Sequence, residues 1–131
     1  MLPKTLFSAA IASLTGACLL TGCVSSFTRF YEPAANARGP AAAAAAAPQF
    51  KWSSDPVSDG KELAGEGYTL IGTSSFIGSN FHDQYVDQEQ AMTQGVSVGA
   101  AVVLLQVDLS DVVAGGCCVR LFASYWSAGQ P

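Results

Sequence analysis

The apolar run Ala100–Val107, in which Gln106 is the one polar residue, constrains the fold most strongly. A continuous apolar run of this length is typical of a β-strand buried on both faces. A sheet that holds such a strand needs cover on both of its sides, because an apolar face left in water is unfavourable.

Two further strands are expected around this run. The segment from Tyr68 to about Phe76 is β-branched and apolar and predicts a strand. The segment from Cys117 to Trp126 alternates weakly and predicts another strand after a loop that ends at Gly115-Gly116. One face of that last strand would carry Cys117, Val119, Leu121, Ala123 and Tyr125, and the other would carry Cys118, Arg120, Phe122, Ser124 and Trp126.

A helix is predicted from about Asp83 to Val98. Ala91, Gly95 and Val98 fall at i, i+4 and i+7, which places them on one helical face. Glycine inside a helix costs about 1 kcal/mol relative to alanine, so Gly95 calls for a close approach of the helix to the sheet. Gly99 stands where a left-handed glycine would end the helix.

Together these elements predict an α+β fold of β-α-β-β order. The first two strands, joined through the helix, should run parallel with a right-handed crossover, and the last two should form an antiparallel hairpin. The expected architecture is a small mixed three-stranded sheet with one helix packed on one face, in residues 60–131. A core of this size is marginal, so the uncovered sheet face should meet another apolar surface.

The first 22 residues have the organisation of an export signal. Lys4 supplies a positive charge, and Leu6–Leu20 is an apolar region too short to span a bilayer comfortably. The four residues Leu20-Thr21-Gly22-Cys23 resemble the lipobox of bacterial lipoprotein signal peptides. The resemblance implies cleavage between Gly22 and Cys23 and acylation of Cys23. The alternative is an ordinary secretory peptide that is cut elsewhere.

Acylation at Cys23 would anchor the chain durably, because each buried methylene adds roughly 0.8 kcal/mol of membrane affinity. The following residue is Val24 and not Asp. In Gram-negative lipoproteins an Asp there resembles an inner-membrane retention signal. The expected location is therefore the bacterial envelope, at the outer membrane facing the periplasm.

The charge balance narrows the classes of partner. Cleavage after residue 22 would leave 109 residues with five Lys and Arg against ten Asp and Glu, a formal net charge of −5. A mildly acidic chain without a basic cluster argues against nucleic-acid binding and against electrostatic docking on anionic lipid.

Residues 23–59 are predicted to form a disordered tether that lifts the domain off the membrane. The segment is rich in proline, and its alanine run Ala41–Ala47 is below the roughly 12 residues that a marginal isolated helix needs. The alternative is a short strand at Gln49–Trp52 that docks on the domain, with Phe50 and Trp52 on one face.

Three glycine-rich and apolar motifs resemble a group of small, uncharacterised bacterial envelope proteins. Gly67–Phe76 is similar to their opening G-Y-x-x-I-G-x-S-S-F, Val98–Leu104 to their V-G-A-x-V-V-L, and Ala123–Trp126 to their closing A-x-Y-W. The resemblance covers about 60 residues and implies a fold and not a chemistry. More distantly, the helix and the second motif are similar to the outer-membrane lipoprotein that senses stress for the Rcs phosphorelay, which relies on separated disulfides.

The cysteine pair Cys117-Cys118 is the strongest candidate for chemistry. Adjacent side chains of a strand point to opposite faces, so a bond between them would distort the ladder. The simplest interpretation is one buried thiol and one that faces a partner. An intermolecular disulfide, or a metal site completed by His82, are the alternatives.

Catalysis is not expected. His82-Asp83 is interpreted as a polar loop pair with Asp83 as the helix N-cap. Ser74 and Ser75 lack the motif that surrounds a nucleophilic serine. No cofactor and no metal ion are expected.

The sequence therefore predicts a lipid-anchored envelope lipoprotein that acts as a non-catalytic interaction or structural module. Its expected partners are the membrane, through lipid on Cys23, and an envelope protein or a second copy, through the apolar sheet face. The alternative is a redox- or metal-responsive envelope sensor that uses Cys117 and Cys118.

Overall fold

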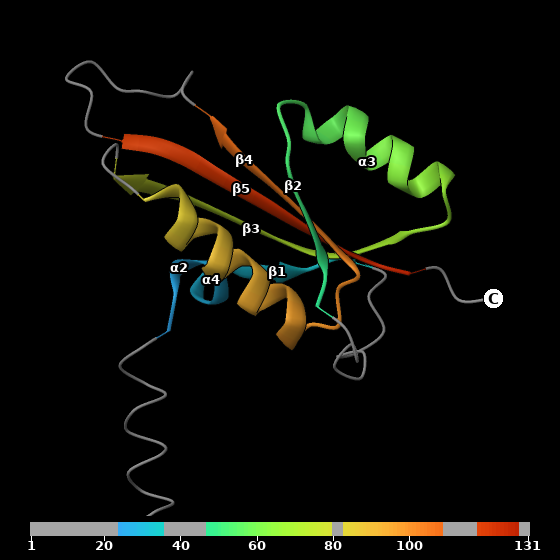
Figure 1. Ribbon diagram of the computed structural model, residues 1–131, viewed down its shortest axis with the longest axis horizontal. Coiled ribbons are helices and arrows are strands. Elements are labelled where there is room, and N and C mark those ends of the chain that lie inside the picture. Colours follow the sequence, from blue (N-terminus) through green and yellow to red (C-terminus); the bar gives the residue numbers. More distant parts are fainter. Residues whose placement is uncertain (1–23, 36–46, 80–82, 109–117, 129–131) are drawn as a thin grey trace, which may run out of the picture.

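The computed structural model describes residues 24–35, 47–79, 83–108 and 118–128. These residues form a five-stranded sheet in the order β1-β3-β5-β4-β2 (Figure 1). β1 is antiparallel to β3, β5 is antiparallel to both β3 and β4, and β2 is parallel to β4. The strands are β1 (Tyr31–Pro33), β2 (Gln49–Trp52), β3 (Thr69–Ser79), β4 (Val102–Asp108) and β5 (Cys118–Ser127).

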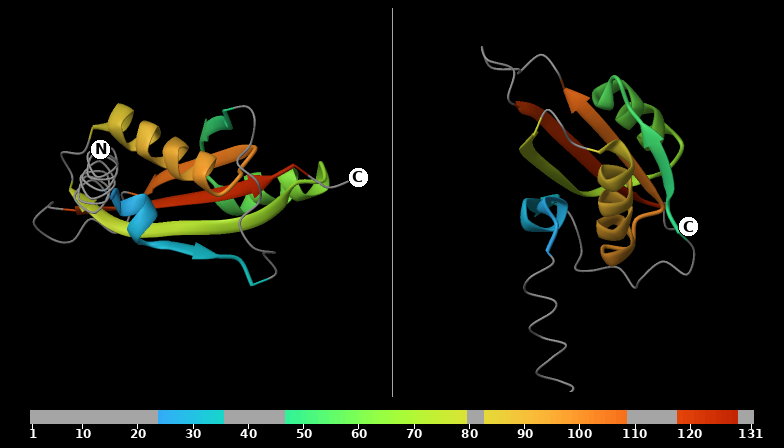
Figure 2. Two further views of the ribbon diagram at one scale, coloured as in Figure 1. Left: turned by 90° about the horizontal axis from the view of Figure 1, so that it is seen from below. Right: turned by 60° about the vertical axis from the view of Figure 1, so that its left-hand side comes forward.

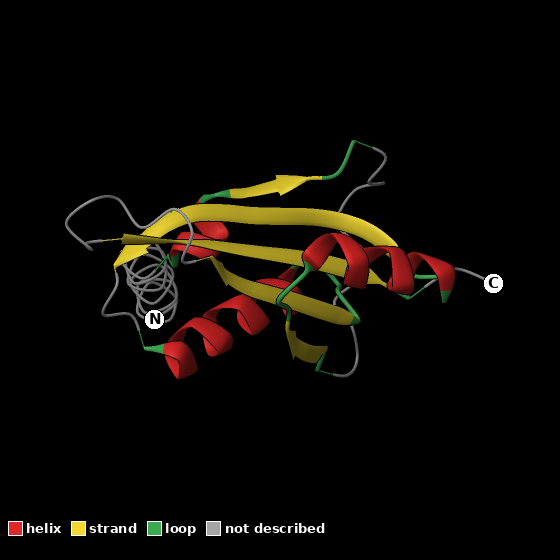
Figure 3. Cartoon of the chain, turned by 90° about the horizontal axis from the view of Figure 1, so that it is seen from above, coloured by secondary structure: helices red, strands yellow, loops and turns green. Residues whose placement is uncertain are grey.

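Within the described residues, three helices accompany the sheet (Figure 3). They are α2 (Ser26–Arg29), α3 (Pro56–Gly65) and α4 (Gln84–Ser97). Asp83 caps α4, because its Oδ1 accepts the backbone N–H of Tyr85 at 2.8 Å. Gly99 follows the helix with a φ of 77°, a left-handed conformation that favours glycine. The predicted cap and the predicted end of this helix are both confirmed.

The mixed α+β class is confirmed, whereas the three-stranded sheet is wrong in its strand count. β3 and β4 run in the same direction, as expected, but β5 lies between them and bonds to both. β5 is suited to a central position because both of its faces are covered: Tyr125 packs on one side and Trp126 on the other. A strand whose two faces are both buried is most stable in the interior of a sheet, where it has hydrogen-bonded neighbours on both edges.

The two additional strands come from the segment for which a tether was predicted. β2 extends the edge of β4: the Gln49 N–H donates to the Ala101 carbonyl and the Ser53 N–H to the Leu105 carbonyl, each at 2.8 Å. This arrangement confirms the alternative of a docked strand at Gln49–Trp52. Pairing with β2 satisfies backbone N–H and C=O groups of β4 that would otherwise be exposed to water at the edge of the sheet. A disordered tether is thus wrong for residues 24–35 and 47–59, and residues 36–46 lie outside the described part.

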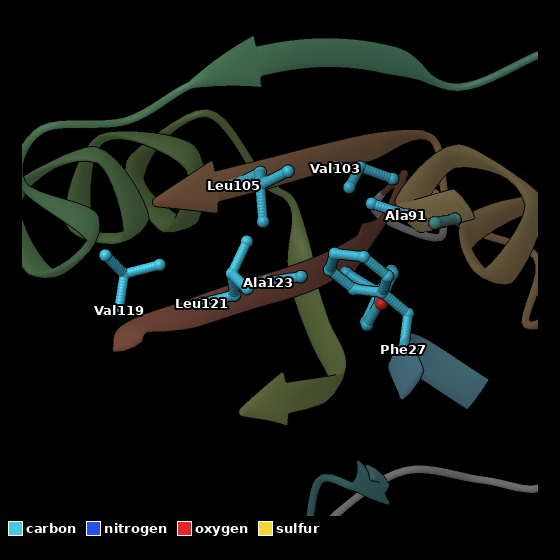
Figure 4. Close-up of a cluster of buried hydrophobic side chains, with 9 residues drawn as sticks. Phe27, Ala91, Val103, Leu105, Val119, Leu121 and Ala123 are labelled. Carbon is cyan, nitrogen blue, oxygen red and sulfur yellow. The ribbon is translucent and has the colours of Figure 1, made fainter. Parts of the chain in front are cut away.

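Alternating side chains divide the core into two clusters. The larger cluster joins β4 and β5 to α4 and to Phe27 of α2, and Figure 4 shows these side chains pointing toward one another. Its buried members are Phe27, Ala91, Ala100, Val103, Leu105, Val119, Leu121, Ala123 and Tyr125. The smaller cluster, on the other face, holds Val102, Leu104 and Trp126, with Leu63, Tyr68 and Leu70 packed against it. α4 and α3 therefore cover opposite faces.

Gly95 permits the close contact between α4 and the sheet. A Cβ placed on this glycine would lie 2.5 Å from Cγ2 of Val103 in β4. Atoms of this kind do not approach so closely, so any larger residue would push the helix away. The expectation of a close helix–sheet approach at Gly95 is confirmed.

Candidate functional site

An apolar groove lies between α3 and the face of β3 and β5 that α4 does not cover. Its volume is about 390 Å³. From here on, this feature is called the α3 groove. Its α3 wall consists of Pro56, Val57, Gly60, Lys61 and Ala64, and its floor consists of Leu70, Thr73, Phe122, Ser124 and Trp126.

The helical period of α3 explains the wall. Val57, Gly60, Lys61 and Ala64 recur at spacings of three and four residues, which places them on one side of the helix. Asp55 begins this helix, because its Oδ1 accepts the backbone N–H of Ser58 at 3.1 Å. Pro56 occupies the first helical turn, where its missing N–H costs nothing.

Trp126 forms the inner floor of the groove. A Cβ on Gly60 would lie 3.1 Å from Cζ2 of the indole ring, so the glycine lets α3 rest on the ring. The indole N–H donates to Oγ of buried Ser124 at 2.9 Å. Because the polar atom of the indole is satisfied within the sheet, the ring offers an apolar surface.

Exposed apolar side chains extend the groove along the sheet. Val57 at the rim is 70% exposed, and Ile77, on the same face of β3, is 61% exposed. Ile77 pairs with Arg120 of β5 and Ser75 with Phe122, so this face continues beyond the first turn of α3. Large exposed aliphatic side chains beside an apolar groove are typical of interaction surfaces.

A polar contact between β2 and α3 fixes the position of the groove wall. Asp59 accepts hydrogen bonds from Oγ of buried Ser53 at 2.6 Å and from Nζ of Lys51 at 3.2 Å. The hydrogen bond from Ser53, followed by that from Lys51, lowers the pKa of the Asp59 carboxyl below its ordinary 3.8. The charged carboxylate therefore holds the start of α3 against the end of β2.

Ser74 has a structural role, because its side chain links α2, β3 and β5. Its Oγ donates to the Phe27 carbonyl at 2.6 Å and lies 2.9 Å from Oη of Tyr125. Because the single hydroxyl proton of Ser74 goes to the carbonyl, Tyr125 is the donor in the second bond. Burial raises the pKa of Tyr125, which keeps the phenol protonated for this role. The three groups tie α2 to β3 and β5.

The remaining candidate residues from the sequence are Gly22, Cys23, His82, Cys117 and Cys118. Gly22, Cys23, His82 and Cys117 lie outside the described residues. Cys118 is half-buried at the start of β5 and is disulfide-bonded. The expectation of a free thiol is therefore wrong for Cys118.

Phe50 and Trp52 do not cover the groove face. Phe50 packs against the larger cluster, on the α4 side, and its ring meets that of Trp52 edge-on with centroids 5.2 Å apart. α3 covers part of the groove face instead. The sequence interpretation missed this helix because it placed the domain boundary inside it, although Asp55-Pro56 is a helix-start signal.

Within residues 24–35, 47–79, 83–108 and 118–128, no group of three or more His, Cys, Asp and Glu side chains is placed to hold a metal ion. Over the same residues, no helix has the length and apolar character that crossing a membrane requires.

Comparisons with protein-family models, with curated proteins and with solved structures found no match to this chain.

Proposed function

We propose that this chain is a lipid-anchored bacterial envelope lipoprotein that acts as a non-catalytic interaction module. The lipobox-like sequence Leu20-Thr21-Gly22-Cys23 supports the anchor, and acyl chains on Cys23 would hold the protein at the outer membrane. The α3 groove supports the interaction role. It is the single observation that carries the proposal, because its lining offers apolar contact and little polar chemistry.

The proposed occupant of the groove is an apolar segment of another envelope protein or of a second copy of this chain. The indole of Trp126 and the ring of Phe122 form a floor of the kind that anchors interface side chains. Lys61 is the charged residue in the lining. An acidic side chain next to the apolar anchor would complement Lys61 at the rim.

Photocrosslinking in cells tests this proposal. The photoreactive residue benzoylphenylalanine replaces Val57 at the groove rim or, as a matched control, Val96 on the opposite side of the sheet, which is 39% exposed. We expect protein adducts from position 57 and none from position 96. An adduct of twice the chain mass identifies a second copy, and any other mass identifies a different protein. Absence of adducts from position 57, or equal yields from both positions, contradicts the groove as an interface.

The anchor has its own test. Cys23→Ser should prevent acylation, which intact-mass analysis detects directly, and should release the chain from the membrane fraction. Unchanged mass and unchanged fractionation would contradict the lipoprotein assignment.

A redox-responsive role is a second candidate, favoured by the disulfide of Cys118 at the start of β5. Reduction would take two electrons and two protons from a dithiol reductant and leave two thiols. β5 is the central strand, so a change at its first residue acts on the sheet beside the groove. A sensor requires crosslinking from position 57 to differ between reduced and oxidised cells, whereas identical yields leave the disulfide a structural role only.

A further inference from the structure

We propose that the surface formed by Val24 and the exposed side of α4 rests on the phospholipid surface, so that the α3 groove faces away from the membrane. This inference rests on the proposed acylation of Cys23. It replaces the predicted spacer with direct contact between the domain and the bilayer.

The proposed anchor is only two residues from the folded domain. Cys23 is bonded to Val24, and Ser25 is already the N-cap of α2, since its side chain accepts the backbone N–H of Thr28. Consecutive Cα atoms are about 3.8 Å apart, so two peptide units separate an acylated Cys23 from the cap by less than about 1 nm. Phe27, buried in the larger cluster, then fixes α2 to the domain. No tether remains to lift the domain off the bilayer.

This short connection would bring α2 and the adjacent side of α4 to the membrane. Figure 2 shows α2 beside α4, and Oγ1 of Thr28 donates to Oε1 of Gln94 at 2.8 Å. Between the two helices lies a shallow hollow of about 490 Å³, lined by Val24 and Thr28 on one side and by residues of α4, including Val86, on the other.

The composition of this surface suits a lipid headgroup region. Val24 and Val86 are both exposed, and Tyr85, which precedes Val86 in the first turn of α4, is 76% exposed. Valine side chains supply apolar contact, and tyrosine is enriched at membrane–water interfaces. Glu89 is the one charged side chain among the described residues that line the hollow. A bilayer rich in zwitterionic phosphatidylethanolamine is therefore the matching surface, and no attraction to anionic lipid is needed.

The proposed membrane surface and the α3 groove lie on opposite sides of the sheet. α2 and α4 pack on the sheet face that carries Val103 and Tyr125, and α3 packs on the face that carries Val102 and Trp126. Contact through α2 and α4 therefore turns the groove toward the aqueous phase. A groove in that orientation is open to a protein partner and is not filled by lipid.

Lipid photocrosslinking of the full acylated chain tests the orientation. Benzoylphenylalanine replaces Val86, on the proposed membrane face, or Val57, on the groove side. Both are valines in the first turn of a helix, and the control is the more exposed of the two, at 70% against 46%. The proteins are reconstituted in vesicles of phosphatidylethanolamine and phosphatidylglycerol that contain a tagged phospholipid. We expect several-fold more lipid adduct at position 86 than at position 57.

Equal adduct yields, or more adduct at position 57, overturn the inference. Position 85 serves as a second probe, with the same expectation, if the substitution at position 86 impairs folding as judged by circular dichroism. A wild-type chain without acyl mass on Cys23 overturns the anchor and the orientation together. An acylated chain with the wrong adduct pattern overturns the orientation alone and leaves the proposed function standing.

Discussion

Gly95→Ala is a direct test of the close contact between α4 and the sheet. The added Cβ would lie 2.5 Å from Cγ2 of Val103. This valine is fully buried in β4, and as a β-branched residue it has few alternative rotamers that would relieve the clash. Overpacking of this kind costs about 1–3 kcal/mol, while alanine returns about 1 kcal/mol of helix propensity. The net expectation is a loss of about 1 kcal/mol in the free energy of unfolding, and at most about 2 kcal/mol.

Urea and thermal unfolding followed by circular dichroism measure this effect on the mature chain with Cys23→Ser. A loss of 1 kcal/mol corresponds to a Tm lower by about 4–8 °C in a small domain. Gly65→Ala at the end of α3 is the matched control, because no atom lies within 4 Å of its added Cβ. That control should be neutral or stabilised by up to about 1 kcal/mol.

A double mutant separates the steric clash from other effects. Val103→Ala removes the methyl groups that the new Cβ would meet, so Gly95→Ala should cost less in that background, with a coupling energy of at least about 0.5 kcal/mol. If Gly95→Ala is as stable as the Gly65→Ala control, or if the two substitutions at positions 95 and 103 are additive, the argument from close contact is wrong.

Three further outcomes are expected. Ser74→Ala should lower the free energy of unfolding by about 1–3 kcal/mol, because it leaves the buried Tyr125 hydroxyl without its acceptor, while Ser75→Ala at the exposed neighbour should change it by less than about 0.5 kcal/mol; equal effects would refute the buried network. The hydrogen-bonded Asp59 carboxylate has a pKa below its ordinary 3.8, so its contribution to stability should be complete above that pH and lost as the pH falls through the lowered value. Asp59→Asn should remove this part of the acid titration, and an unchanged curve would contradict the assignment. In Cys23→Ser the intact mass should lack acyl groups, and an acylated variant would exclude Cys23 as the lipidation site.

Elements with a strong local period could be predicted from the sequence. α4 carries small residues on one face, and its start and stop signals are Asp83 and Gly99. Its bounds could therefore be predicted from residues close together in the sequence. The alternation of β5 likewise fixed which side chains belong to which face, and Val119, Leu121, Ala123 and Tyr125 are together in the larger cluster as expected.

The remaining elements depend on contacts distant in sequence. β1 and β2 are short strands whose pairing partners lie some 40 to 50 residues further along the chain. The composition of β1 gives little signal, and the spacing of Phe50 and Trp52 indicated β2 only as an alternative to a tether. The position of β5 between β3 and β4 is equally non-local. The α3 groove could not be predicted for the same reason, because its wall precedes β3 and its floor includes the last strand.

The central position of the C-terminal strand has a consequence for the order of assembly. β1 and β3 are on one side of β5 and β4 and β2 on the other, so the two halves are connected in the sheet only through β5. A polypeptide that emerges with its amino end first cannot unite these halves until residues 118–127 are available. Strand pairing between residues so distant in sequence slows folding. A stop codon before residue 118 would leave two unjoined ribbons with exposed edges, a species prone to aggregation.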